Sequence, residues 1–512
     1  MKFLFFLFFI FPLAASQEAL FHSLDSRSVI QQLAFYELYP DTKDGQKAWQ
    51  QAWKLLSHGA EIDEILPPSE GLPLIDVRAI ISLVTHRSSS QDAPILTADQ
   101  LKLLNELGKK LPNRTKPGAH VWTKEEVLAL PPEKIDLARG LLINQFDADP
   151  DAKKKILQYE AMLDLMALEI RASLPRNASP TEKIDAINHF IFEEMHFRFP
   201  PHSLYAKDID LYTFLPAVLD SREGVCLGVS ILYLSLAQRL DLELEIITPP
   251  GHIYLRYNEG DRLINIETTA RGINLPSEVY LGINTRSLQE RNIKDVIGLA
   301  FINHASVFWE LGKYNETVTL YEKAQTYLPE DRLLKLFLGL NYLFIGETSK
   351  GRKLLEELRN FTFSYAVSPE TMAEDYLTGR TDVQGIKNIF LHVDETRASI
   401  LAKQAKLQET LQRFPRFRSG LFQYAITWLQ LGRPAEALEA LNRYHQLDAR
   451  DASIEYYLSC LLFERMDYPR AWAHFTSVDK ILQARHHNPK ALQQLRLQLL
   501  HFSPPPNKSS PA

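Results

Sequence analysis

The sequence predicts a multidomain protein with a helical N-terminal domain, an α+β core with an antiparallel sheet, and a C-terminal all-α solenoid. Three observations support this prediction. Apolar residues recur at helical spacing through residues 17–175. In residues 176–295, helical patterns come first and short alternating strands follow, which is the order typical of α+β domains. From residue 296 onward, related positions recur at a fixed spacing, as in a stack of helical hairpins.

The composition is that of an ordinary globular protein. Of the 512 residues, 45% are hydrophobic and 23% are charged, which suits a chain of roughly two to four domains. The net charge of −6 leaves no excess of basic residues, so we expect no nucleic acid partner. The two cysteines, Cys226 and Cys460, are too few for a disulfide framework. No spacing typical of metal ligands occurs, and His486-His487 is expected to be exposed, so we predict no metal site and no cofactor.

The N-terminus has the pattern of a secretory signal peptide. Lys2 precedes an apolar run, Phe3–Leu13, and small residues follow at positions 14–16. The alternative is a membrane anchor, but the run is much shorter than the roughly 20 apolar residues that span a bilayer. We therefore expect residues 1–16 to be removed and the protein to be exported, either periplasmic or secreted. No later segment is apolar enough for a stable membrane span.

The N-terminal domain, residues 17–175, is expected to be a packing unit made of helices. Its apolar periodicity predicts helices at Val29–Tyr39, Gly45–Leu56, Leu72–Thr85, Ala98–Leu111, Lys124–Asn144 and Asp151–Leu174. No chemical motif occurs in these residues. The domain could also wall one side of a cleft in the core.

The core, residues 176–295, begins at a strong helix start. In the run 179–182, serine is the N-cap, proline takes the first helical position, and glutamate completes a capping box. A second, buried helix is predicted from Cys226 to Leu240, after the break at Gly224. Pro276 is expected to mark the end of the sheet. The predicted strands are Leu242–Thr248, His252–Tyr257 and Arg262–Glu267.

The last two strands would form a hairpin that brings a histidine to a carboxylate. The run Asn258-Glu259-Gly260-Asp261 is a hairpin turn signal. With a two-residue loop inside that run, His252 lies directly opposite Glu267, with Cβ atoms about 4.5–5.5 Å apart. A slipped register would undo this pairing.

Cys226, His252 and Glu267 are the candidate catalytic residues. A helix start favours a thiolate, because unpaired backbone N–H groups and the helix dipole attract negative charge. An imidazole would take the thiol proton and later protonate a leaving amine, and a carboxylate would orient the imidazole. The alternative is a buried structural cysteine, a histidine bonded to backbone at a strand edge, and a solvated glutamate at a strand end.

These residues resemble the active-site pattern of the transglutaminase-like superfamily, which has a papain/transglutaminase-like α+β core. The family pattern is a Gly-x-Cys helix start, a strand led by histidine, and a strand ending in Asp-Pro-Thr. The matching runs are Gly224-Val225-Cys226, Gly251-His252 and Glu267-Thr268-Thr269. The resemblance covers residues 176–290 and is strongest to the SirB-type branch, in which this core is joined to tetratricopeptide repeats. Many members of that branch lack the cysteine, and this chain departs from the pattern in having Glu267 and Thr268 in place of Asp and Pro.

The C-terminal region matches the tetratricopeptide (TPR) length of 34 residues. Gly312 and Gly346 are separated by this length, and so are Trp428 and Leu462. Cys460 falls inside a repeat helix and is expected to be core. The predicted parts are a TPR pair at 296–358, an irregular helical insertion at 359–415, a second TPR pair with a capping helix at 416–502, and a disordered tail at 503–512.

The leading hypothesis for function is cysteine-dependent acyl transfer on peptide or glutamine-type amides. Water as acceptor would make the protein a cysteine protease or amidase, and an amine as acceptor would make it a transglutaminase. The repeats would bind a protein partner in their concave groove. The alternative is a catalytically inactive transglutaminase-like/TPR scaffold of the cell envelope.

The signal pattern predicts that Gln17 is the mature N-terminal residue, because signal cleavage follows small residues such as Ser16. Intact-mass spectrometry of the exported protein measures this directly. Recovery of an uncleaved N-terminus on a membrane-bound product would show an anchor instead.

Overall fold

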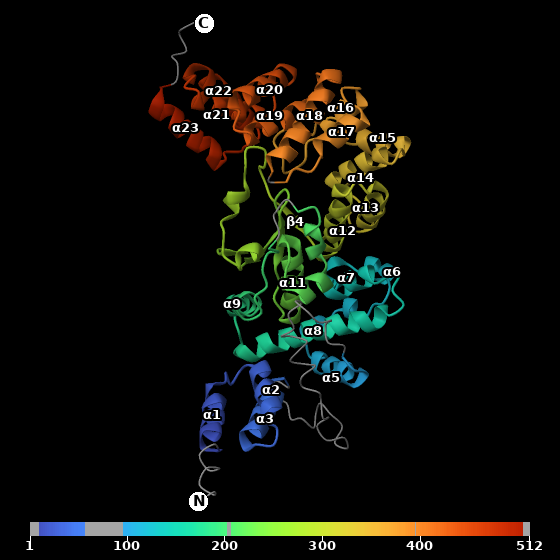
Figure 1. Cartoon of the computed structure of the whole chain (residues 1–512), viewed down its shortest axis with the longest axis vertical. Coiled ribbons are helices and arrows are strands. Elements are labelled where there is room, and N and C mark those ends of the chain that lie inside the picture. The colour runs from blue at the N-terminus through green and yellow to red at the C-terminus, as the bar shows by residue number, and fades with distance from the viewer. Residues whose placement is uncertain (1–9, 57–95, 202–205, 395, 505–512) are drawn as a thin grey trace, which may run out of the picture.

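The structure is a computed structural model that describes residues 10–56, 96–201, 206–394 and 396–504. Figure 1 shows an elongated molecule with helices at the N-terminal end, a small sheet and its helices in the middle, and an arched array of helices at the other end. No helix within the described ranges is long and apolar enough to cross a bilayer. The predicted helix at 72–85 lies outside these ranges, as do parts of the predicted signal peptide and tail.

The N-terminal region is helical, as its periodicity predicts. Its helices are α1 (Ile10–Ser23), α2 (Val29–Leu38), α3 (Lys43–Leu56), α5 (Ala98–Gly108), α6 (Lys124–Ala129), α7 (Leu137–Gln145) and α8 (Ala152–Ser173). The prediction of one helix over 124–144 is wrong. Pro131 and Pro132 divide it into α6 and α7, because proline fixes φ and removes an N–H donor.

The core helices begin where the sequence places them. At the start of α9 (Pro180–Asn188), Ser179 accepts a hydrogen bond from the Glu182 N–H, and the Glu182 carboxylate accepts one from the Ser179 N–H at 2.7 Å. A π-helical turn continues α9. The helices α10 (Leu215–Ser221) and α11 (Cys226–Arg239) follow. Almost every side of α11 is buried, which explains its continuous apolar run.

The sheet has four antiparallel strands in the order β3-β2-β1-β4. The strands are β1 (Glu245–Thr248), β2 (Tyr254–Asn258), β3 (Leu263–Ile266) and β4 (Gln289–Arg291). The sheet does not end at Pro276, as predicted, because β4 returns to pair with the free edge of β1. Three polar residues on an edge strand give no alternation that sequence reasoning could detect.

The β2–β3 hairpin register differs from the predicted one by two residues. Glu259 donates its N–H to the Arg262 carbonyl at 3.0 Å, across a two-residue turn that begins at Gly260. The φ of Gly260 is +83°, and a positive φ at the first turn position is typical of type II′ turns. A shift of two residues leaves each side chain on its face of the sheet. It nevertheless removes His252 from the position directly opposite Glu267.

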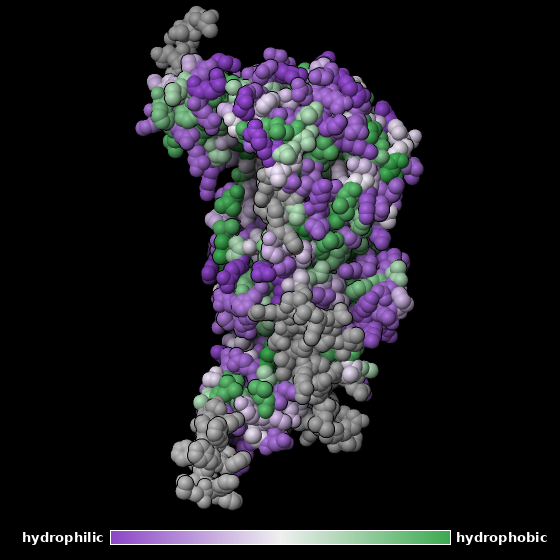
Figure 2. All heavy atoms as spheres, viewed as in Figure 1, coloured by the Kyte–Doolittle hydropathy of each residue, from purple (hydrophilic) through white to green (hydrophobic). Residues whose placement is uncertain are grey.

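The C-terminal region is an all-helical array of hairpins. Its helices are α12 (Ile293–Glu310), α13 (Tyr314–Tyr327), α14 (Arg332–Phe344), α15 (Thr348–Glu356), α16 (Met372–Leu377), α17 (Val383–Ile389), α18 (Arg397–Arg413), α19 (Arg418–Gln430), α20 (Pro434–Leu447), α21 (Ala452–Glu464), α22 (Tyr468–Gln483) and α23 (Lys490–Phe502). Figure 2 shows a largely hydrophilic face over the array. At its end, α23 buries Leu492, Leu495 and Leu499 as a capping helix does, and exposes Leu497 and Phe502.

The same turn joins the helices of four hairpins in this array. A residue with positive φ ends the first helix in each: Gly312, Gly346, Gly432 and Met466. The next residue donates its N–H to a carbonyl five positions back, at 2.8–2.9 Å, as in a Schellman motif. Met466 stands 34 residues after Gly432, so the period holds although the glycine is absent. The repeated turns identify the region as a TPR solenoid.

The segment that precedes β4 in the chain, residues 281–288, crosses from the core to the array, and we call it the crossing segment (Figure 1). Its Asn284 carbonyl accepts the Val367 N–H at 3.0 Å. Its Gly282 carbonyl is 2.7 Å from Nε2 of His487. His487 is therefore buried in a contact between core and array, and its predicted exposure is wrong.

A buried ion-pair network fixes α11 against α8. Arg239, in the last turn of α11, is fully buried and donates from Nε to Asp164 at 2.7 Å. Arg114 also pairs with Asp164. Beside them, Arg139 makes a two-point contact with Glu160 at 2.5 and 2.6 Å. Buried charges are tolerated only when they are paired in this way.

We predict that Asp164→Asn strongly destabilises the protein, by about 3–5 kcal/mol, because it removes the ion-pair partner of the buried Arg239 and the nearer of the two carboxylates that pair with Arg114. The matched control is Asp44→Asn, which breaks the exposed Lys47–Asp44 pair and should cost about 0–1 kcal/mol. Chemical denaturation of the two variants measures both costs. Equal costs would show that the buried network does not hold the core together.

Candidate active site

Cys226 is the first residue of α11 and its side chain is half-buried. No side chain caps this helix start, so its first backbone N–H groups remain free to meet a negative charge. The preceding Val225 donates its N–H to the Tyr212 carbonyl at 3.1 Å. One turn further on, a Cβ added to Gly228 would lie 2.2 Å from the same carbonyl oxygen. The loop at Tyr212 thus packs directly on the helix and fixes the position of the thiol.

His252 lies in a turn rather than at the start of a strand, because β2 begins only at Tyr254. The His252 N–H donates to the Pro249 carbonyl at 3.0 Å. Pro250 and Gly251 are the two central residues, and the φ of Gly251 is +73°. Proline followed by a residue with positive φ is the pattern of a type II turn. This turn places the imidazole near Cys226, whose interaction with it helps to raise the pKa of His252.

Glu267 reaches His252 from a diagonal position. Continuing the observed register would place Thr269 opposite His252, with Glu267 two residues away. Diagonal neighbours in a sheet are about 7–8 Å apart, which is further than directly opposed residues. The Glu267 carboxylate nevertheless accepts a hydrogen bond from Nε2 of His252 at 2.7 Å. The extra methylene of glutamate over aspartate lengthens the side chain and helps it cover this distance.

Three further donors hold the Glu267 carboxylate, which is 5% exposed. Oε1 accepts from the Thr269 hydroxyl at 2.6 Å and from the Thr269 N–H at 3.2 Å. Oε2 accepts from the Tyr280 hydroxyl, and the Tyr280 ring stacks on the imidazole of His252 with centroids 5.4 Å apart. Sequence reasoning missed Tyr280, since it follows the predicted end of the sheet and belongs to no motif.

The pKa values of His252 and Glu267 are shifted in opposite directions, and both shifts favour the charged side chain at neutral pH. Burial would lower the pKa of His252, but hydrogen bonds to Cys226 and Glu267 outweigh it and raise the pKa to about 10. Burial would raise the pKa of Glu267, but hydrogen bonds from His252, Thr269 and Tyr280 lower it to about 2. Because Nε2 of His252 serves the carboxylate, Nδ1 is the ring nitrogen left for the thiol. The arrangement can therefore hold an imidazolium between a carboxylate and a thiolate.

Thr268, which stands where the resembling family has proline, connects the carboxylate strand to α11. Its hydroxyl donates to the Cys226 carbonyl at 3.4 Å and is 3.1 Å from the Ser230 hydroxyl. Thr268 is buried, so both contacts are shielded from water. The departure from the family pattern therefore adds a contact between the elements that carry the thiol and the carboxylate.

A comparison with protein families agrees with this geometry. The model of the Transglutaminase-like superfamily matches residues 157–294. These residues form a transglutaminase-like domain. The match begins inside α8 and includes Cys226, His252 and Glu267. The matched range therefore includes both the helix that carries Asp164 and the residues of the candidate site.

Curated relatives match short stretches of the chain. "F-box only protein 21" of Mus musculus is 31% identical over 80 residues, which is 16% of this chain and 12% of that protein. A UPF0162 protein of Pseudomonas aeruginosa is 29% identical over 109 residues, or 21% of this chain and 39% of that protein. The chain thus spans well under half the length of either relative.

Among solved structures, a thermophilic TPR protein from Thermus thermophilus shares 19% identity with a TM-score of 0.21, over 40% of this chain and 98% of its own. The TPR2AB domain of yeast Sti1, solved in a complex with pHSP90, shares 16% identity with a TM-score of 0.20, over 40% of this chain and 85% of its own. The assignment of the repeats rests on the four recurring turns and not on these scores.

We predict that His252 stabilises the fold in a pH-dependent way. Its folded pKa of about 10 lies above the ordinary value of 6.5, so the stabilisation is complete below about pH 6.5 and is lost as the pH rises toward 10. The Tm of His252→Gln should therefore fall below that of the wild type at pH 6, and the gap should close by pH 10. Thermal melts across this range measure it, with the exposed His501→Gln as control. A gap that stays constant with pH would contradict the raised pKa.

Proposed function

We propose that this protein is exported and transfers acyl groups from peptide or glutamine-type amides through a thioester on Cys226. The observation that carries the proposal is an imidazole that is hydrogen-bonded to a buried carboxylate and interacts with a thiol at a helix start without a side-chain cap. The N-terminal signal pattern supports export.

Each group has a defined part in this reaction. The Cys226 thiolate attacks the amide carbon, and the negative charge moves to the carbonyl oxygen near the first N–H groups of α11. The C–N bond then breaks as His252 delivers its proton to the departing amine, which leaves a thioester. Glu267 touches no substrate in this scheme and is a positioning residue that keeps the imidazole oriented and charged.

The second half of the reaction regenerates the thiolate. Neutral His252 takes a proton from an incoming nucleophile, which attacks the thioester and displaces Cys226. Water as the nucleophile completes a hydrolysis, and a primary amine completes a transamidation. The proposal includes both acceptors, because the same three side chains serve either one.

The repeats offer a place for the protein partner. A cavity of about 480 Å³ lies between α12, α18, α19 and the turn before α21. Its wall mixes apolar and polar side chains, among them Met372, Phe390, Phe422, Glu310, Lys403 and Gln423. Such a wall suits a peptide segment, which presents apolar side chains and backbone polar groups together.

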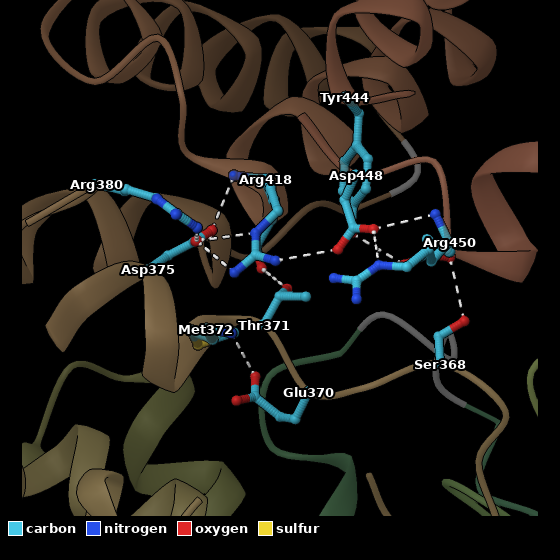
Figure 3. Close-up of polar contacts among 12 residues, drawn as sticks. Ser368, Glu370, Thr371, Met372, Asp375, Arg380, Arg418, Tyr444, Asp448 and Arg450 are labelled. Atoms are coloured by element: carbon cyan, nitrogen blue, oxygen red, sulfur yellow. Dashed lines mark hydrogen bonds and ion pairs between the residues drawn. The ribbon is translucent and has the colours of Figure 1, made fainter. Parts of the chain in front are cut away.

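An ion-pair cluster stiffens the edge of this cavity. Figure 3 shows the Arg418 guanidinium between the carboxylates of Asp375 and Asp448. Nε of Arg418 donates to Asp375 at 2.9 Å and its NH1 group donates to Asp448 at 3.3 Å. These contacts join α16, the start of α19 and the end of α20. A partner would therefore meet a preformed wall, which reduces the entropy lost on binding.

The proposal predicts that Cys226 is an activated nucleophile that depends more on His252 than on Glu267. Iodoacetamide should alkylate Cys226 half-maximally well below the value of about 8.5 that an ordinary thiol shows. His252→Ala should raise that midpoint by roughly 2 pH units or more, because it removes the cationic partner. Glu267→Gln should raise it less, since Tyr280 and Thr269 still hold the side chain. Peptide mass spectrometry across pH measures each midpoint.

Cys460 is the internal control for this experiment. Burial raises its pKa to about 11, although a hydrogen bond with Tyr456 opposes the shift, so Cys460 should stay unlabelled where Cys226 reacts. Cys226→Ala identifies the labelled peptide. If the alkylation midpoint of wild-type Cys226 is that of a free thiol, the acyl-transfer proposal is wrong. The inactive scaffold is then the better hypothesis.

A further inference from the structure

Three side chains from successive helices of the last repeats converge on one point. His445 is near the end of α20, Glu455 is in the first turn of α21, and His474 is in α22. Nδ1 of His445 is 2.5 Å from one Glu455 oxygen, and Nδ1 of His474 is 2.9 Å from the other. The three ligand atoms all lie within 4.8 Å of one another. Spacings of 10 and 19 residues match no metal motif, so the sequence does not indicate this cluster.

The charge of Glu455 makes the cluster unusual. The carboxylate is fully buried, and within the described ranges its ion-pair partners are the two imidazoles alone, with no lysine or arginine within 4.0 Å. If both imidazoles are neutral, a negative charge is buried without compensation, which is costly. The buried carboxylates of Asp164 and Asp375 are each neutralised by arginine, whereas Glu267 in the candidate active site pairs with one histidine, His252.

We propose that His445, Glu455 and His474 bind one divalent transition-metal ion, for which Zn²⁺ is the probe. Two imidazole nitrogens and a carboxylate oxygen suit zinc and its neighbours, whereas calcium and magnesium prefer oxygen ligands alone. Zinc holds such ligands at about 2.0–2.2 Å, so tetrahedral partners lie roughly 3.4 Å apart. The present contacts of 2.5 and 2.9 Å need to open by less than about 1 Å to reach that geometry, and the two imidazole nitrogens, which lie within 4.8 Å of each other, need to approach by at most about 1.4 Å.

The ion has a route to the site and a consequence for the fold. The His445 side chain is 33% exposed, so one ligand faces solvent and leaves a fourth position for water. On binding, each imidazole takes the neutral tautomer that carries its proton on Nε2, any second proton passes to water, and Nδ1 donates its lone pair to the metal. The ion then joins α20, α21 and α22, and the folded state alone presents all three ligands together. Metal binding should therefore raise the Tm of the protein.

The test is zinc binding by the full chain after treatment with a chelator. All proteins carry Cys226→Ser, because the thiol beside His252 would itself attract zinc. We expect one Zn²⁺ per chain by competition with a chromogenic chelator, a higher Tm with zinc, and the visible absorption of low-coordinate Co²⁺ when cobalt replaces it. His445→Gln, Glu455→Gln and His474→Gln should each weaken binding by roughly tenfold or more, since even indirect partners of a metal ligand matter by that factor.

The matched control is His189→Gln, which removes an exposed imidazole that also lies between two carboxylates, Glu193 and Glu194. It should leave zinc binding unchanged. Absence of zinc binding overturns the proposal. Zinc binding that survives in a folded double variant, with both His445→Gln and His474→Gln, overturns it too. If circular dichroism shows that a variant does not fold, the test is the Co²⁺ absorption spectrum of the protein that keeps His445, Glu455 and His474. A purely octahedral spectrum from that protein overturns the proposal.

Discussion

The ion pair between Arg239 and Asp164 is the constraint on which the site geometry depends. The thiol stands at one end of α11, so the orientation of the helix must be fixed at the other end. There Arg239 bonds to Asp164, and Gln238 bonds to the Leu137 N–H and the Ile135 carbonyl, both at 3.0 Å. The positive charge of Arg239 also complements the negative, C-terminal end of the α11 dipole. The positive end of that dipole lies at Cys226. The α7–α8 region thus fixes the position of α11, and with it the position of Cys226, in addition to packing against the core.

Local signals predicted the parts of the site that depend on local structure. The capping box at Ser179 and the helix start at Cys226 appear where the sequence indicates, because neighbouring residues alone determine them. The contact between His252 and Glu267 was also predicted, although from a register that is two residues wrong. The contact survives the error because the side-chain period of a strand is two and because the glutamate side chain is long. A one-residue error would have placed the carboxylate on the opposite face.

The missed features all join segments that are distant in the sequence. Tyr280, the edge strand β4 and the crossing segment acquire their partners only after the chain has folded back on itself. The same is true of the cluster at Glu455, whose three members sit on three helices. Met466 shows a different limit, because a tertiary context can hold a residue at positive φ without glycine. Pro131 and Pro132 indicate a helix break in the sequence, but the apolar periodicity on both sides of them favours one continuous helix, and that prediction is wrong.

The crossing segment, together with Tyr280 just before it, connects the core to the repeat array over a short stretch of chain. Tyr280 bonds to the carboxylate of the candidate site, and Asn284, four residues later, bonds to Val367 and lines the cavity in the repeats. Four residues span at most about 14 Å even when fully extended. The solenoid therefore cannot move away from the core beyond the slack in that span without breaking the hydrogen bond of Tyr280 to Glu267 or those of Asn284 to Val367. Bending of the repeat array is therefore coupled to Tyr280, whose hydroxyl helps to hold the carboxylate that orients His252.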